Sequence, residues 1–141
     1  MNKEIINEAE YMDIVIGLLN PPFSIDNIVH LIFIAFCVKH KIKGKKYFSG
    51  KDVIDKFISN INLKLMVHTK DISIILSVID KLVKCDFIKI VDSKIYILKP
   101  IVVDLQNEFL LKCKSRKTNN PILESKKLDS KAFIEEILRY V

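Results

Sequence analysis

The chain has 141 residues, half of them hydrophobic and 28% charged, which is the composition of a folded globular protein and not of a disordered one. This length suits one domain with a substantial core and is short for two. The formal net charge of +6 favours an acidic partner, either nucleic acid or an acidic protein surface.

Cysteine usage and the N-terminal residues favour the cytoplasm. Cys37, Cys85 and Cys113 lie in apolar or helical patterns without paired spacing, as reduced thiols do. The N-terminal segment carries three glutamates within its first ten residues, whereas a signal peptide begins with basic residues. The longest apolar stretch, Ile28 to Val38, is far shorter than the roughly 20 residues of a membrane span. We therefore expect a cytoplasmic protein with no membrane segment.

The N-terminal part of the chain predicts two helices separated by a proline turn. Apolar residues recur at helical spacing from Ile5 to Leu19. Asn20-Pro21-Pro22 cannot continue that helix, and a second helix is expected from about Ile25 to His40. The second helix is apolar nearly all round, so it is either central to the domain or pressed against another chain. In a chain of this size we expect one of its faces to meet a partner.

The stretch from Ser49 to Lys99 follows the element order of a winged helix. An amphipathic helix is expected to begin with the capping-box spacing after Ser49, and residues 60–68 are expected to connect it to a second helix over 71–85, capped by Thr69. Two strand-like runs joined by Asp92-Ser93 then predict a tight hairpin, which would be the wing.

The predicted helix over 71–85 has an unusual surface for a winged helix. Apolar residues wrap most of its circumference, and its few polar residues mix acids with bases. A DNA-reading helix needs donors and cations on its outer side to meet phosphate oxygens and base edges. The pattern therefore favours a protein-binding module.

The C-terminal part of the chain predicts a helix, a linker and a last helix. Pro100 suits the first turn of a helix that runs to about Lys117. Residues 118–127 have no periodic apolar pattern and are expected to be a linker. Residues 128–141 have an apolar stripe at helical spacing, with Asp129 as the candidate cap. This last helix can fold back or dock elsewhere.

The predicted fold class is mainly α, with α+β character. A winged-helix domain with added N-terminal helices occupies residues 1–117, and the linker and C-terminal amphipathic helix follow it.

One short motif resembles an enzyme signature. Asn20-Pro21-Pro22-Phe23 resembles the Asn-Pro-Pro-Phe motif of adenine-N6 methyltransferases, which also need a glycine-rich cofactor loop on a parallel α/β sheet. This chain has three glycines and no alternating strand-helix pattern, so we interpret the motif as a helix-breaking turn. It also has no serine-centred nucleophile elbow. We therefore predict a protein that is not an enzyme and binds no cofactor.

The histidines are the candidate metal ligands. Cys37 and His40 stand three residues apart, and His30 and His68 complete the set. A structural zinc site usually needs four converging ligands in two close pairs, and the sequence offers no second pair. The pattern favours ordinary buried or surface histidines and no metal site.

Two basic clusters are the candidate contacts to a DNA backbone. Such contacts would be independent of DNA sequence and would weaken steeply with salt. The alternative is a solvated turn and a helix C-terminus whose cations favour the helix dipole. The candidate residues are Lys41, Lys43, Lys45 and Lys46 in the first cluster, and Lys112, Lys114, Arg116 and Lys117 in the second.

Surplus apolar surface on the helices within 28–38 and 72–83 predicts a protein partner that covers it. The candidate interface residues are Phe33, Phe36, Ile74, Val78, Phe133 and Ile137.

Over about residues 14–98 the layout resembles a known family. A segment ending in Leu18-Leu19-Asn20-Pro21, an apolar helix from Ile25 to Val38 and then a winged helix resemble the small middle components of bacterial ABC-three-component systems, including the small subunit of Lamassu antiphage complexes. The layout is also similar to the kite-type winged-helix subunits of structural-maintenance-of-chromosomes (SMC) ATPases. The resemblance implies a non-enzymatic adaptor that joins an SMC-like or ABC-type ATPase to an effector in a hetero-oligomeric, DNA-associated antiviral defence complex.

Two other functions stay open. A homodimeric transcriptional regulator would use the same winged helix and leave DNA contact to the wing and the basic turn. A phage-encoded inhibitor would have the same sequence features and differ in its target. An adaptor is expected to copurify with an ATPase encoded beside it, whereas a regulator is expected to dimerise and shift its own promoter DNA.

Overall fold

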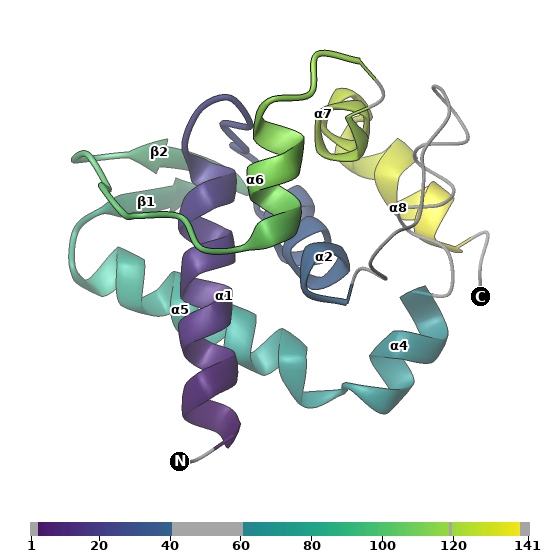
Figure 1. Cartoon of the computed structure of the whole chain (residues 1–141), viewed down its shortest axis with the longest axis horizontal. Coiled ribbons are helices and arrows are strands. Elements are labelled where there is room, and N and C mark those ends of the chain that lie inside the picture. Colours follow the sequence, from purple (N-terminus) through teal and green to yellow (C-terminus); the bar gives the residue numbers. More distant parts are fainter. Residues whose placement is uncertain (1–2, 41–60, 119, 139–141) are drawn as a thin grey trace.

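The computed structural model of the chain describes residues 3–40, 61–118 and 120–138 (Figure 1). These residues are mainly helical, with a two-stranded antiparallel sheet. The helices are α1 (Lys3–Leu19), α2 (Ile28–Lys39), α4 (Ile61–Val67), α5 (Lys70–Lys84), α6 (Glu108–Lys114), α7 (Pro121–Lys127) and α8 (Ser130–Leu138). The strands are β1 (Ile88–Val91) and β2 (Lys94–Ile97). The helix predicted to begin after Ser49 lies outside the described residues.

Helices α1, α2 and α5 pack against one another and form the centre of the protein (Figure 1). Each contributes fully buried apolar side chains at helical spacing, among them Ile14 and Leu18 from α1, Leu31 and Ile34 from α2, and Ile75 from α5. Helix α2 also contacts α7 and α8. Its sequence is apolar nearly all round because other helices of the same chain surround it.

Helix α5 differs from its prediction because it is amphipathic. Val78, Ile79 and Leu82 are buried, whereas Asp80 and Lys81 between them are exposed. The buried positions recur every three or four residues, so one stripe meets the core and the opposite side meets solvent. The prediction that apolar residues wrap most of this helix was wrong.

The ends of the first two helices follow local sequence signals. Helix α1 ends at Leu19, directly before the predicted proline turn, in which the Pro21–Pro22 peptide bond is cis. Helix α2 begins at Ile28, three residues later than predicted, because the side chain of Asn27 caps it by accepting the backbone N–H groups of Val29 and His30.

The predicted connector over 60–68 was wrong in part, because α4 occupies Ile61–Val67. Thr69 is not the side-chain cap of α5: its backbone is in the right-handed helical region and its side chain makes no capping hydrogen bond. A tight corner therefore joins α4 directly to α5, and the backbone N–H of Asp71 donates to the His68 carbonyl oxygen at 3.0 Å.

The predicted hairpin is confirmed. Strands β1 and β2 pair antiparallel, with Lys89 opposite Tyr96 and Val91 opposite Lys94. The turn residues Asp92 and Ser93 both have positive φ, of 51° and 69°, as a two-residue type I′ turn requires. The free side of β2 is partly covered where Asn27 forms a bridge with Lys94.

Replacing Ser93 by glycine is expected to stabilise the protein by about 0.5–1 kcal/mol, because glycine adopts positive φ without the steric cost of a Cβ atom. Urea denaturation measures the change. Ser77, exposed in the middle of α5, is the matched control, since glycine there is expected to cost about 0.5 kcal/mol. Equal effects of the two substitutions would contradict the turn assignment.

The helix predicted to begin at Pro100 was wrong over its first half. The chain follows a non-helical path to Asn107, and only α6 is helical. Contacts from α1 and from the turn after it hold this segment: Asp13 accepts the backbone N–H of Asn107 at 2.8 Å, and the Asn20 side chain donates to the Ile101 carbonyl oxygen at 2.9 Å. These long-range bonds compete with helix formation, and no local pattern reveals them.

The linker predicted over 118–127 was also wrong. Helix α7 occupies most of this range, capped by Asn120, and Ile122 is fully buried. The Asn120 side chain also donates to the Cys113 carbonyl oxygen at 2.7 Å and so ties α7 to the end of α6. Seven residues are too few for a clear periodic pattern, so tertiary contacts define this helix.

The C-terminal helix folds back onto α2. Its predicted cap is confirmed, since the Asp129 carboxylate accepts the backbone N–H of Ala132 at 2.7 Å. The ring of Phe133 stacks on that of His30, with centroids 4.9 Å apart, and His30 Nε2 lies 2.7 Å from the Leu128 carbonyl oxygen. Of the two arrangements left open by the sequence, docking on the same chain is the observed one.

Candidate functional site

Three of the six predicted interface residues lie in the core. Phe36, Val78 and Phe133 are each 0% exposed and are covered by other helices of the same chain. Predicting them as contacts to a partner was wrong, because the packing of α2 with α5 and α8 already buries them. Phe33 and Ile74 are half-buried, and the side chain of Ile137 lies outside the described residues.

The second predicted DNA-contact cluster lies at the C-terminal end of α6 and just beyond it. Lys112, Lys114 and Lys117 are exposed, and Arg116 is half-buried. Cations at this end of a helix favour its dipole, so the structure is compatible with both interpretations of the cluster. The first cluster, within 41–46, lies outside the described residues.

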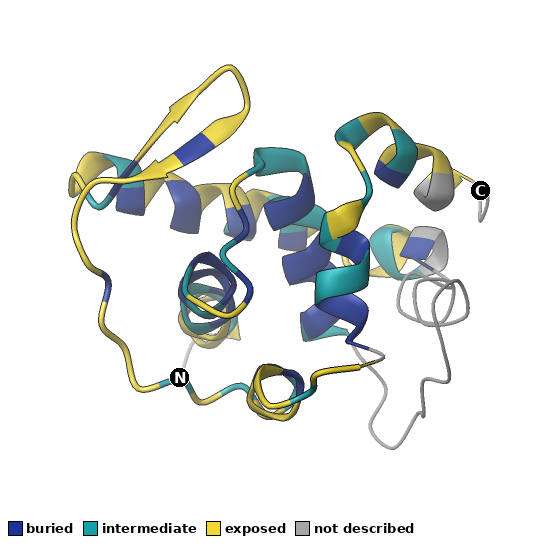
Figure 2. Cartoon of the chain, turned by 90° about the horizontal axis from the view of Figure 1, so that it is seen from above, coloured by how far each residue is buried: buried dark blue, intermediate teal, exposed yellow. Residues whose placement is uncertain are grey.

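The hairpin and the segment after it expose a run of apolar side chains that sequence reasoning did not select. Figure 2 shows the hairpin and this segment as largely exposed. Val102 is 92% exposed, the largest value among the exposed large hydrophobic residues. The exposed members, which we call the hairpin surface, are Ile90, Val91, Tyr96, Ile97, Leu98, Val102 and Val103.

The sequence contained a signal for the hairpin surface. Ile90-Val91 and Tyr96-Ile97-Leu98 place apolar residues on both faces of the strands. A two-stranded sheet can turn only one face to the core. Val91 and Tyr96 lie on the outer face, while Ile90 and Ile97 share the inner face with the buried Ile88 and Ile95 but are themselves partly exposed. Continuous apolar runs in such a short hairpin therefore leave hydrophobic side chains in solvent.

Lysines accompany the hairpin surface. The Nζ atoms of Lys89 and Lys94 each lie 5.5 Å from the centre of the Tyr96 ring, and Lys99 Nζ lies 4.6 Å from that of Phe87. Cations over aromatic rings are weakly attracted to them. The hairpin thus presents apolar groups with positive charge beside them.

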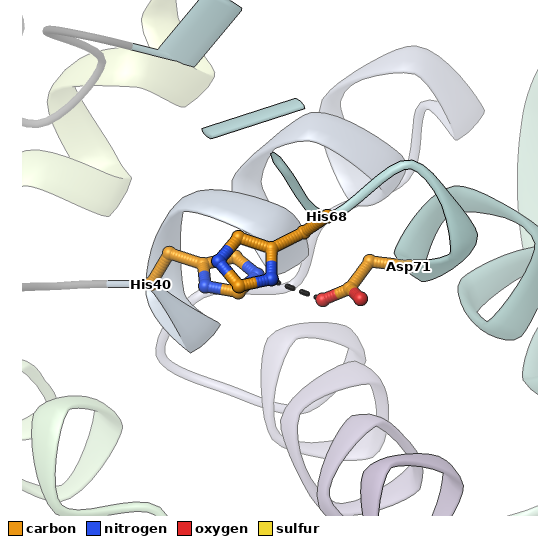
Figure 3. Close-up of side chains that lie close together, drawn as sticks. All are labelled: His40, His68 and Asp71. Carbon is orange, nitrogen blue, oxygen red and sulfur yellow. Dashed lines mark hydrogen bonds and ion pairs between the residues drawn. The ribbon is translucent and has the colours of Figure 1, made fainter. Parts of the chain in front are cut away.

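A second cluster joins three helix ends near the middle of the protein. His40 is the C-terminal cap of α2, His68 follows α4, and Asp71 lies in the first turn of α5 (Figure 3). His40 Nε2 lies 2.7 Å from Asp71 Oδ2, and the two imidazole rings stack with their centroids 4.1 Å apart. One ligand atom from each of the three side chains lies within 4.8 Å of the others.

Tyr11 of α1 supports this cluster from the core. Its hydroxyl donates to Asp71 Oδ2 at 2.5 Å, and both residues are buried. Burial raises the pKa of Tyr11 far above its usual range, and the hydrogen bond to Asp71 and the charge of its carboxylate raise it further. Tyr11 therefore stays protonated and acts as a hydrogen-bond donor.

The environment of His40 has opposing effects on the pKa of its imidazole. Burial lowers the pKa of His40, while its hydrogen bond to Asp71 acts in the opposite direction; the net shift is downward. The neutral imidazole is thus favoured relative to an exposed histidine. A neutral imidazole has a lone pair available on one ring nitrogen.

The sequence placed four candidate ligands together, namely His40, Cys37, His30 and His68, and only part of that grouping holds. His68 lies beside His40, whereas His30 contacts α8 instead. Asp71 was predicted only as the first residue of the helix over 71–85, although its spacing of three residues from His68 is a local signal for two ligands at one helix start. The approach of His40 to this pair depends on how α2 packs with α5.

In the described ranges, no helix combines the length and apolarity needed to cross a membrane. Comparisons of the chain with family models, with curated proteins and with solved structures find no match.

Proposed function

We propose that this chain is a non-enzymatic, winged-helix accessory subunit that bridges an SMC-like or ABC-type ATPase to an effector in a DNA-associated antiviral defence complex. The hairpin surface carries the protein-binding part of this proposal. The resemblance of the element order to small middle components of ABC-three-component systems supplies the class of partner. The subunit would act in a hetero-oligomer in the cytoplasm.

The arrangement of the elements supports a winged-helix organisation. Helices α1, α2 and α5 pack together, and the hairpin follows the third of them directly. The bridge between Asn27 and Lys94 places a short extended segment beside β2, between the first two helices in chain order. In this arrangement α2 is the helix that precedes α5 in the winged helix. From the sequence, that position was expected for the helix beginning after Ser49.

The exposed side of α5, which would read DNA in such a fold, favours protein binding. Lys81 forms an ion pair with Glu8 of α1, and Lys84 Nζ lies 2.8 Å from an Asp80 carboxylate oxygen. Lysines paired with carboxylates are less suited to phosphate oxygens, because a carboxylate and a phosphate compete for the same cation. Leu76 adds an apolar side chain to this side.

A partner gains hydrophobic free energy by covering the hairpin surface. Fully burying one Val, Leu or Ile side chain is worth about 1.5–3 kcal/mol, and the cores of stable interfaces are enriched in such contacts. The adjacent Lys89 and Lys94 favour a partner surface with carboxylates around an apolar centre.

Copurification with the native gene neighbours tests this function. The unaltered chain is expected to retain an ATPase in stoichiometric amount, and Ile97→Asp to reduce its recovery at least about tenfold, since the carboxylate would be desolvated in the interface. Leu111→Asp on α6 is the matched control, because Leu111 is 45% exposed and Ile97 is 48% exposed. It should leave recovery unchanged.

Two results would contradict this proposal: the first would refute the adaptor assignment, and the second would refute the role of the hairpin surface in it. One is recovery of the unaltered chain without an ATPase. The other is equal ATPase recovery with Ile97→Asp and with the unaltered chain, both shown by circular dichroism to be folded, which would remove the hairpin surface from the interface.

The outer face of the hairpin favours a second candidate function, that of a homodimeric DNA-binding regulator. Lys89, Lys94 and Tyr96 share this face and could contact phosphates as a wing does. A regulator would form homodimers without any other protein. It would also retard DNA in a gel-shift assay, with an affinity that falls steeply as salt is added, and the double variant Lys89→Glu/Lys94→Glu would abolish this DNA binding.

A further inference from the structure

We propose that His40, His68 and Asp71 form a binding site for a divalent transition-metal ion, with Zn²⁺ as the expected occupant. This site would fasten the corner between α4 and α5 to the end of α2. The inference concerns the chain by itself and does not depend on the identity of any partner.

The ligand types and their positions suit zinc. Imidazole nitrogen and carboxylate oxygen are both common zinc ligands, at about 2.0–2.2 Å from the ion. At such distances two ligand atoms of a tetrahedral site lie about 3.3 Å apart. The three ligand atoms already lie within 4.8 Å of one another, and His40 Nε2 is 2.7 Å from Asp71 Oδ2. Small side-chain movements therefore suffice to surround an ion.

His68 is the ligand that would have to move most. Its ring is stacked on that of His40 with an angle of 22° between the planes, whereas each ring must direct a nitrogen lone pair at the ion. His68 is exposed and lies directly after α4, so its ring can turn without displacing the core. Figure 3 shows both rings on the same side of the Asp71 carboxylate.

Tyr11 supplies the second shell of such a site. Carboxylates that bind metals are usually oriented by a further hydrogen bond, and the hydroxyl of Tyr11 donates one to Asp71 at 2.5 Å. Tyr11 is fully buried in α1, so the orientation of Asp71 is fixed by the core of the protein. The Lys64 side chain donates to the carbonyl oxygen of His40 at 3.0 Å and further connects α4 with the end of α2.

Three protein ligands would leave one coordination position for water or for a group from another molecule. The ligands come from the ends of three different helices, and one ion would link the end of α2 to a pair of ligands that lie 28 and 31 residues later in the chain. Because the folded chain brings these ligands together, metal binding is expected to stabilise the fold.

Metal titration of the purified chain tests the proposal. After treatment with a chelator, the unaltered chain is expected to bind one Zn²⁺ in competition with a chromophoric chelator. His68→Ala is expected to weaken binding by at least about 100-fold, more than loss of a second-shell contact does. Thr69→Ala is the matched control, since Thr69 is an exposed neighbour without a ligand atom for this site, and it should bind as the unaltered chain does.

Further variants separate loss of a ligand from loss of structure. Asp71→Asn should weaken binding, whereas Asp80→Asn, on the exposed side of the same helix, should not. Tyr11→Phe is expected to reduce affinity about tenfold while binding persists. Because Asp71 is buried, its variant counts only if circular dichroism shows a folded chain, and the exposed His68 remains the decisive position.

Co²⁺ in place of Zn²⁺ identifies the ligand atoms. Visible absorption of a four- or five-coordinate ion without a thiolate charge-transfer band would support nitrogen and oxygen ligands. A thiolate band that disappears in Cys85→Ser would assign the metal to that exposed cysteine and overturn the proposal. Absence of one-to-one binding by the unaltered chain, or unchanged affinity in His68→Ala, would overturn it as well. None of these outcomes bears on copurification with an ATPase.

Discussion

Replacing Phe36 by alanine is expected to lower the free energy of unfolding of the isolated chain by about 3–5 kcal/mol. Phe36 is fully buried in α2, and its ring centre lies 4.6 Å from that of His40. Truncation removes apolar area from the core and leaves a cavity that close-packed helices fill only partly. Domains are typically stable by about 5–15 kcal/mol, so much of the stability would be lost. Urea denaturation followed by circular dichroism measures the change.

Phe33 is the control for this prediction. It lies one turn earlier on α2 and is only half-buried, so its replacement by alanine is expected to cost about 1 kcal/mol. If Phe36 instead faced a partner, Phe36→Ala would leave the isolated chain nearly as stable as before. A loss of less than 1 kcal/mol would thus contradict the core position of this ring.

Replacing Phe133 by alanine is expected to release α8 while the rest of the chain stays folded. Among the α8 side chains that the structure describes, Phe133 is the fully buried one, and its stacking on His30 fastens the helix to α2. Loss of a buried aromatic ring costs about 3 kcal/mol or more, which corresponds to an at least about 100-fold larger population of the locally unfolded helix and equally faster hydrogen exchange. Hydrogen exchange followed by mass spectrometry would show the loss of protection in residues 130–138.

Ile134 provides the comparison for that experiment, because the neighbouring side chain is 39% exposed. Ile134→Ala is expected to change exchange in α8 by less than about threefold. In both variants the backbone amides of α1 and α5 should be as well protected from hydrogen exchange as they are in the unaltered chain. Equal loss of protection in α1, α5 and α8 after Phe133→Ala would show that α8 unfolds only with the whole protein.

Local signals predicted the elements that short-range chemistry defines. The proline turn after Leu19 ends α1, the Asp92-Ser93 turn forms the hairpin, and Asp129 caps α8. In each case the residues that determine the structure lie within a few positions of it. The conformational preferences of those residues were therefore sufficient to predict these elements.

Elements that depend on distant contacts were not predictable in the same way. The segment before α6 is held by Asp13, 94 residues away from Asn107, against the helical preference inferred from Pro100. Helix α7 is short, and burial of Ile122 stabilises it more than any repeated pattern does.

The same limit applies to the candidate sites. His68 and Asp71 are neighbours in sequence, but His40 joins them only because α2 and α5 pack together. For the hairpin surface the necessary information was local, since apolar residues occupy both faces of the strands. The candidate interface residues all came from predicted helices, so these strand residues were not among them.

The central position of α1 has a consequence for the order in which the protein can fold. Its Tyr11 bonds to a residue 60 positions later in the chain, and Asp13 bonds to one 94 positions later. A chain emerging from the ribosome therefore presents the apolar side of α1 well before α5 is available to cover it. Contacts of such long sequence separation also slow folding. Nascent or truncated chains that end before α5 are accordingly expected to be the most dependent on chaperones and the most prone to aggregate.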